Sequence, residues 1–148
     1  MVLALAMCAG CGTALTPASL SPSFAEVFAG LYATQQSRLG RTEVTQAGLR
    51  PQATCARTGA SATGPGEDWL CKVAYIDQDT AYTQSFEVQL KPDGCWTAEG
   101  PPTAQPAELV DAVDGTRTPN PLSEFDGCLD TSWSSAGTSR PRTPLPGE

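Results

Sequence analysis

The chain has 148 residues, a formal net charge of −7 and no histidine. Its acidic balance argues against nucleic-acid binding, because phosphate contacts need clustered Lys and Arg, and the nine basic residues are scattered. The lack of histidine excludes Ser–His and Cys–His catalytic pairs. Thirteen prolines and fourteen glycines favour loops over long regular elements, so one small domain is expected.

An apolar run opens the chain. Residues 1–9 (MVLALAMCA) are too few to span a bilayer as a helix, but they match the hydrophobic region of a signal peptide. Two small residues, Ala9 and Gly10, then stand directly before Cys11. This arrangement resembles the lipobox of bacterial lipoproteins, in which a signal peptidase cuts before a cysteine that carries a diacylglycerol thioether. The resemblance implies that residues 1–10 are removed, that Cys11 is lipidated, and that the membrane is a partner on its extracytoplasmic face.

The segment departs from the lipobox pattern at two points. Cys8 stands where a Leu is usual, and the positively charged region that begins a signal peptide is missing, which predicts a natural start further upstream. Three other interpretations stay open: lipidation of Cys8, a redox-active Cys8-x-x-Cys11 pair, and a buried N-terminal strand. The redox pair requires a following helix in a βαβ unit, whereas residues 13–23 are typical of a linker that contains Pro and Ser.

Residues 11–22 are predicted to form the lipid-anchored linker, because they are small and uncharged and contain proline. A helix is then expected over residues 23–39, with Ser23 and Glu26 in a capping-box pattern at its start. Its apolar side chains recur at helical spacing on one face. They are Phe24, Val27, Phe28, Leu31 and Tyr32.

The spacing of apolar residues then changes to two. In segment 82–90, Tyr82, Phe86, Val88 and Leu90 share one face and every residue between them is polar, which indicates a half-buried antiparallel strand. Segment 69–76 is predicted to be another strand, with Trp69, Cys71, Val73 and Tyr75 on one face. The sequence KPDG at 91–94 predicts a tight turn into a strand over 95–98, and residues 52–57 suit a further strand at the sheet edge. The expected fold class is α+β, with the N-terminal helix packed on a three- to four-stranded antiparallel sheet.

Beyond residue 101 the pattern weakens. Residues 107–113 are predicted to form a helical turn or two, and residues 122–129 to lie across the domain. Residues 134–148 are rich in Ser, Thr, Pro and Gly, so a disordered tail is expected there. The single domain is therefore predicted to span residues 23–133.

Four cysteines lie within the predicted domain: Cys55, Cys71, Cys95 and Cys128. They contain no C-x-x-C pair, which argues against structural zinc, and several thiols in a small chain indicate disulfides in an exported protein. Three pairings are available. Cys55–Cys71 and Cys95–Cys128 are predicted, because the first pair lies on successive strands and the second would fix segment 122–129 to the hairpin.

Motifs for nucleotides, cofactors or metals are not found, so neither a cofactor nor a metal is predicted. Asp77-Gln78-Asp79 resembles the start of a calcium loop, but the later Gly and Glu are lacking and a turn is favoured. Glu67 and Asp68, in a Gly-rich loop before a strand, and Trp133, near the domain end, are the candidate binding surface.

Two function classes follow. The first is a non-catalytic binding or accessory module at the cell surface, whose partner is an unknown protein, peptide or cell-wall component, since loops on a rigid sheet often carry recognition. The alternative is a small exported hydrolase that uses a carboxylate pair, which requires two acids about 5–9 Å apart in a cleft.

Overall fold

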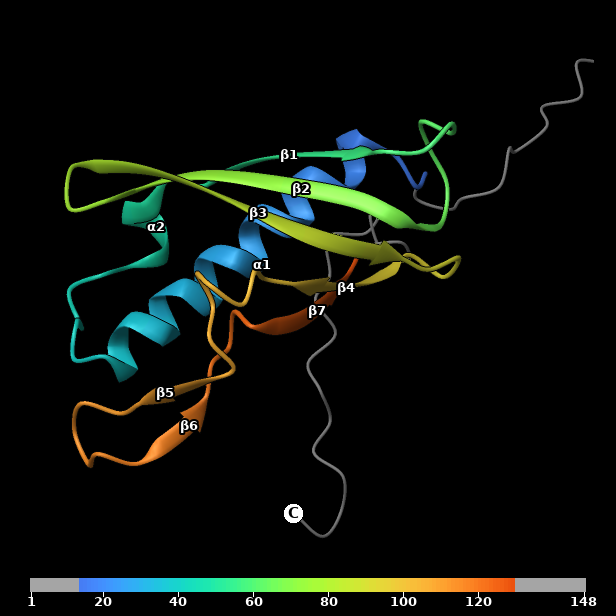
Figure 1. The fold of residues 1–148 in the computed structure, drawn as a ribbon. Coiled ribbons are helices and arrows are strands. Elements are labelled where there is room, and N and C mark those ends of the chain that lie inside the picture. The colour runs from blue at the N-terminus through green and yellow to red at the C-terminus, as the bar shows by residue number, and fades with distance from the viewer. Residues whose placement is uncertain (1–13, 130–148) are drawn as a thin grey trace, which may run out of the picture.

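One long helix packs on one face of a five-stranded antiparallel sheet in the computed structural model, which describes residues 14–129 (Figure 1). The strand order is β1-β2-β3-β4-β7, and β5 and β6 form a separate two-stranded sheet. The elements are α1 (Pro17–Arg38), α2 (Gln46–Leu49), β1 (Gln52–Arg57), β2 (Gly66–Asp77), β3 (Thr80–Leu90), β4 (Cys95–Glu99), β5 (Glu108–Val110), β6 (Arg117–Pro119) and β7 (Glu124–Cys128). The predicted α+β class is confirmed.

The helix begins earlier than the sequence predicts. Thr16 is its N-cap, and Thr16 and Ser19 form a reciprocal capping box ahead of a wholly buried Leu20. The predicted start at Ser23 is therefore wrong, and residues 17–22 of the predicted linker belong to α1. Pro22 lies inside α1, where proline lacks the N–H that a helix interior uses. Burial of Leu20 against the sheet offsets that missing bond.

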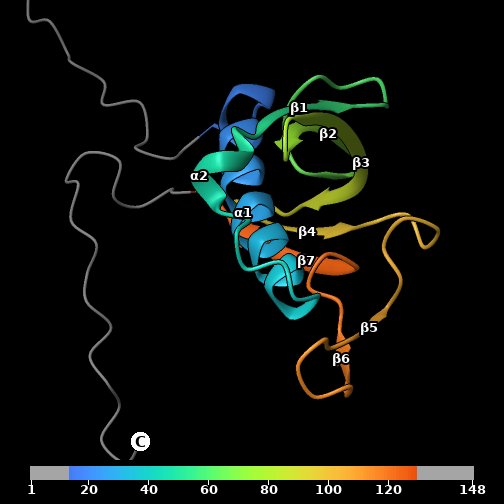
Figure 2. The same cartoon turned by 90° about the vertical axis from the view of Figure 1, so that its left-hand side faces the viewer.

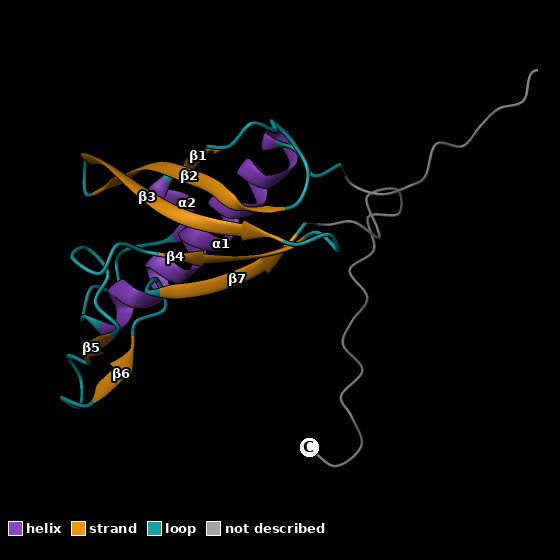
Figure 3. Cartoon of the chain, turned by 45° about the vertical axis from the view of Figure 1, so that its right-hand side comes forward, coloured by secondary structure: helices purple, strands orange, loops and turns teal. Residues whose placement is uncertain are grey.

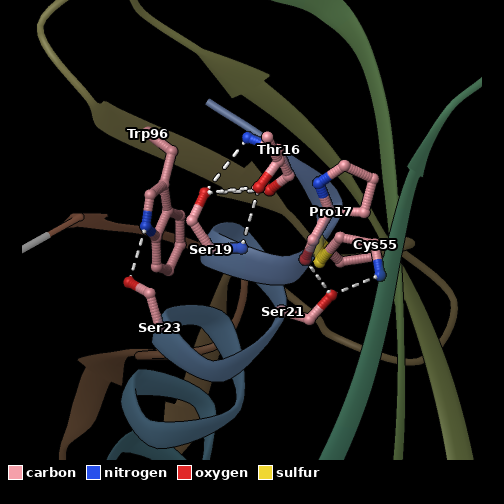
Figure 4. Close-up of a disulfide and its surroundings, with 8 residues drawn as sticks. Thr16, Pro17, Ser19, Ser21, Ser23, Cys55 and Trp96 are labelled. Carbon is pink, nitrogen blue, oxygen red and sulfur yellow. Dashed lines mark hydrogen bonds between the residues drawn. A yellow bond between two sulfur atoms is a disulfide. The ribbon is translucent and has the colours of Figure 1, made fainter. Parts of the chain in front are cut away.

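Serines in the first turns of α1 fasten the helix to the sheet (Figure 4). The backbone N–H of Cys55 donates to Ser21 Oγ at 3.0 Å, and Trp96 Nε1 donates to Ser23 Oγ at 3.2 Å. These two bonds satisfy polar groups on β1 and β4 that the helix covers. No helix within residues 14–129 is long and apolar enough to cross a bilayer.

The core lies between α1 and the inner face of the sheet. Figure 2 shows the strands arcing around one side of α1. The Phe24 ring lies 5.4 Å from both the Phe86 and Trp96 rings, centre to centre. The buried face predicted for β2 and β3 is confirmed at Trp69, Cys71, Val73, Tyr75, Phe86, Val88 and Leu90. It is wrong at Tyr82, which is 46% exposed near the β2–β3 turn. The other sheet face is exposed, as at Leu70 and Ile76.

The C-terminal part departs from the prediction. Residues 107–113 form no helical turn, because Glu108–Val110 pairs with Arg117–Pro119 across a turn at Gly115, which has a φ of 69°. The connection covers residues 111–116, and the Asp111 N–H donates to the Thr116 carbonyl at 2.8 Å. Its Asp114-Gly115 pair is a turn signal that the sequence prediction missed. The resulting small hairpin projects from the main sheet (Figure 3). The segment predicted to lie across the domain contains β7, which pairs with β4.

Both predicted disulfides are confirmed. Cys55 stands directly opposite Cys71 in the β1–β2 ladder, and Cys95 stands opposite Cys128 in the β4–β7 ladder. Strands β1 and β7 are the two edges of the sheet. Each disulfide therefore joins an edge strand to its inner neighbour.

Candidate functional site

The structure separates the two adjacent acids that the sequence proposed as a binding surface. Asp68 Oδ1 accepts from Arg57 Nε and Nη2, at 2.9 and 2.7 Å, and Asp68 Oδ2 accepts from the Gly59 N–H at 2.9 Å. The Arg57 hydrogen bonds lower the pKa of the Asp68 carboxyl. Asp68 therefore orders loop 58–65, while the exposed Glu67 contacts Gln89 at 3.4 Å. Trp133 and Cys11 lie outside the described residues.

Glu67 belongs to an acidic patch on the outer sheet face. Glu87 stands opposite Glu99, and Glu99 stands opposite Glu124, in adjacent strands. With Glu67 they line a shallow hollow of about 190 Å³. Three like charges in register destabilise a sheet. The sequence prediction missed this ladder because its members come from three strands whose register the sequence does not give.

A larger hollow lies between α2 and the β2–β3 turn. Its volume is about 600 Å³, within the range of small-molecule sites. Residues 43–45, 47–50 and 76–79 line it. Val44, Ala47, Leu49 and Ile76 supply apolar surface, and Glu43, Arg50, Asp77 and Asp79 supply charge. An apolar wall with a few charged groups is typical of a ligand site.

Backbone strain gathers at the same hollow. Within residues 14–129, three residues other than glycine have a positive φ: Arg50 at 46°, Gln78 at 48° and Asp79 at 66°. All three line the hollow. Each left-handed residue costs about 1 kcal/mol and persists only where its surroundings hold it. Gln78 Nε2 is held by Glu43 Oε1 at 2.9 Å, so the turn is tied to the opposite wall.

Asp77 stands at the inner edge of the hollow and is 6% exposed. Its carboxylate accepts from Arg41 Nη1 and Nη2, at 2.8 and 2.5 Å, and from the Tyr32 hydroxyl at 2.6 Å. The Arg41 hydrogen bonds hold the pKa of Asp77 below its usual value, although burial opposes them. Burial and the bond to Asp77 raise the pKa of the Tyr32 phenol. The site therefore holds a fixed carboxylate and a neutral tyrosine.

A buried chain of amides continues from Arg41 into the domain. Arg41 Nη1 donates to Gln36 Oε1 at 2.8 Å, Gln36 Nε2 donates to Gln35 Oε1 at 3.0 Å, and Gln35 Nε2 donates to Gln105 Oε1 at 2.9 Å. Gln105 Nε2 then reaches Gln84 Oε1 at 2.7 Å. The sequence could have indicated this network. Gln35 and Gln36 lie three and four residues after Tyr32, and this helical spacing places them on the same buried face.

Three carboxyls whose pKa departs from the usual value are not set up to act as general acids. A general acid needs a carboxyl whose pKa is raised towards neutrality, whereas hydrogen bonding lowers the pKa of Asp68, Asp77 and Asp114. Within the described range, no group of three or more Asp, Glu, Cys or His side chains is placed to hold a metal ion. What the hollow offers is a preformed, partly apolar surface with fixed charges.

Comparison with known proteins yields no family model, no curated protein and no solved structure that matches the chain.

Proposed function

We propose that the chain is an exported lipoprotein, anchored through Cys11 on the extracytoplasmic face of the cell membrane, whose domain is a non-catalytic binding or accessory module. The lipid anchor is supported by the apolar run that ends in Ala9-Gly10-Cys11. Export is supported by the two disulfides, since such bonds persist in oxidising compartments. A diacylated cysteine holds a soluble domain at a bilayer durably, as a single chain does not.

The observation that carries the binding role is the hollow between α2 and the β2–β3 turn. The carboxylate of Asp77, which is 5% exposed and paired with Arg41 at the inner edge of the hollow, is a costly feature that packing alone does not require. A protein, peptide or cell-wall component is the proposed partner. We prefer this hollow to loop 58–65, because Asp68 is committed to Arg57 and Gly59.

The anchor is tested by mass spectrometry of the mature N-terminus. With a lipoprotein leader placed ahead of residue 4, a processing-competent bacterium is expected to yield a protein whose Cys11 carries a diacylglyceryl group. Cys11→Ala should abolish the modification and the membrane association, while the matched Cys8→Ala should preserve both. An unmodified Cys11, or a lipid on Cys8, would contradict the proposal.

The binding site is tested with a photocrosslinking amino acid on intact cells. Three exposed alanines give matched positions: Ala47 in the hollow, Ala60 in loop 58–65 and Ala74 on the outer sheet face. A partner captured from position 47 but not from position 74 is the expected result. Capture from position 60 alone would favour the loop, and identical products from all three positions would remove the hollow from the site.

The alternative, a small exported hydrolase, is favoured by one feature, the ladder of Glu87, Glu99 and Glu124. Opposite residues on antiparallel strands have Cβ atoms about 5 Å apart, near the carboxyl spacing of retaining glycosidases. Hydrolysis of chromogenic glycosides that Glu99→Gln abolishes and the exposed helix variant Glu26→Gln retains would move the protein into this class.

A further inference from the structure

Both ends of the described chain lie at the same end of the domain. The carbonyl of Leu15 accepts from the Gly64 N–H at 2.7 Å, and the Leu129 N–H donates to the Gly94 carbonyl at 2.8 Å. Gly64 belongs to loop 58–65 and Gly94 to turn 91–94. Figure 1 shows this loop and this turn together at one end of the sheet, with the β2–β3 turn at the other. We call the end that holds loop 58–65 and turn 91–94 the terminal end.

The hollow lies at the opposite end. Strand β2 runs from Gly66, beside the terminal end, to Asp77, which lines the hollow. Eleven steps along a strand cover roughly 35 Å. The 22 residues of α1 cover a similar length, about 33 Å. Arg41, just beyond the end of α1, pairs there with Asp77.

A lipid on Cys11 would hold the terminal end close to the bilayer. Leu15 is the fourth residue after Cys11, and even a fully extended chain of four steps reaches only about 14 Å. Loop 58–65 (TGASATGP) contains no charged residue, and in turn 91–94 Lys91 balances Asp93. These two segments therefore carry no net charge, unlike the chain as a whole at −7, and the acidic patch that contains Glu67 lies on the outer sheet face beside them.

We propose that the anchored domain stands with loop 58–65 and turn 91–94 towards the bilayer and with the hollow at the far end, so that the hollow takes a water-soluble or wall-borne ligand and not a lipid of the anchoring membrane. The inference rests on the proposed lipid anchor at Cys11. It adds an orientation and excludes one class of ligand from the site.

The test is energy transfer from a labelled domain to a labelled bilayer. Lipidated Ala60→Cys and Ala47→Cys variants, both at exposed positions, are labelled with one maleimide fluorophore while the native disulfides stay oxidised. They are reconstituted in phosphatidylcholine–phosphatidylglycerol vesicles that carry acceptor-labelled headgroups. Because position 60 lies roughly 30 Å nearer the anchor, its transfer is expected to exceed that from position 47 at least about twofold.

The outcomes separate the two proposals. Vesicle flotation and the N-terminal mass report the anchor, whereas the ratio of the two transfer efficiencies reports the orientation. Protein that floats and gives equal transfer, or stronger transfer from position 47, overturns the orientation alone. Protein that does not float overturns the anchor and the orientation with it.

Discussion

Asp77 is the residue at which the hollow and the interior of the domain meet. Its side chain is 5% exposed, and that of its partner Arg41 is 34% exposed, so the carboxylate depends on hydrogen bonds from the protein while the guanidinium also reaches water. A buried charge without its partner is strongly destabilising. The pair therefore fixes the geometry of the hollow more firmly than an exposed ion pair would.

Asp77→Asn is expected to lower the free energy of unfolding by about 2–3 kcal/mol, because charged hydrogen bonds from Arg41 and Tyr32 are lost or weakened. The folded pKa of Asp77 lies below its unfolded value, so this stabilisation is complete above about pH 4 and is lost as the pH falls through the folded pKa. Urea unfolding of both proteins at pH 7 and at pH 3 measures the difference.

The matched control is Asp79→Asn, two residues along the same turn. Asp79 is exposed, and asparagine tolerates its φ of 66°. The free energy of unfolding of the Asp79→Asn variant should stay within about 0.5 kcal/mol of that of the parent. The difference in unfolding free energy between Asp77→Asn and the parent should narrow at low pH. A difference that does not narrow would show that the charge on Asp77 is not the source of the stability.

Single residues of the hollow could not be identified from the sequence. Asp77 and Asp79 carry a turn signal, and nothing local shows that one is buried against Arg41 and the other exposed. Glu67 and Asp68 are neighbours in the chain, yet one contacts Gln89 and the other Arg57. These partners lie 22 and 11 residues away, a separation at which spacing rules no longer apply.

Elements with a long, regular pattern were predictable, and short ones were not. Strands β2 and β3 are 12 and 11 residues long, and large apolar residues recur at every second position in much of each, so their period is visible. Strand β7 has five residues, with Phe125 as its one buried side chain, and therefore shows no period. Its place at the sheet edge comes from pairing with β4, which only the fold reveals.

The first turn of α1 is a testable correction to the sequence prediction. Leu20→Ala is expected to cost about 3 kcal/mol, because a fully buried leucine leaves a cavity when truncated. Leu39→Ala, at a position 39% exposed, removes the same atoms and should cost well under half as much. Urea denaturation compares the two. Equal, small losses of stability in the two variants would mean that residues 17–22 are part of the linker and not of the packed helix.

The glutamate ladder predicts a stabilising substitution. Glu99→Gln removes the middle charge between Glu87 and Glu124, and should raise the free energy of unfolding by on the order of 0.5 kcal/mol. The gain should shrink as salt screens the repulsion. Glu26→Gln on α1 makes the same change in net charge away from the ladder. Thermal melts at low and high salt measure the stability of both variants. Equal stability of Glu99→Gln and Glu26→Gln would refute local repulsion within the ladder.

At the scale of the whole molecule, the two disulfides close both edges of the sheet. Cys55–Cys71 spans 16 residues and Cys95–Cys128 spans 33. In the chain-entropy model, such loops stabilise the folded state by about 3 and about 4 kcal/mol. A small domain has a net stability of similar size, so the loss of either bond should be serious. Each bond also holds an edge strand on its inner neighbour.

The two disulfides should nevertheless differ in how they respond to a reductant. Cys55 and Cys71 are 1% and 0% exposed, whereas Cys128 is exposed, and thiol–disulfide exchange requires access to a sulfur atom. A mild thiol at neutral pH is therefore expected to open Cys95–Cys128 first and to leave Cys55–Cys71 intact until the domain unfolds. Timed alkylation with peptide mapping measures both rates. In concentrated denaturant, where both bonds are accessible, the rates should converge. Equal rates in the native protein, or earlier opening of Cys55–Cys71, would mean that local opening of β1 and not side-chain exposure governs access.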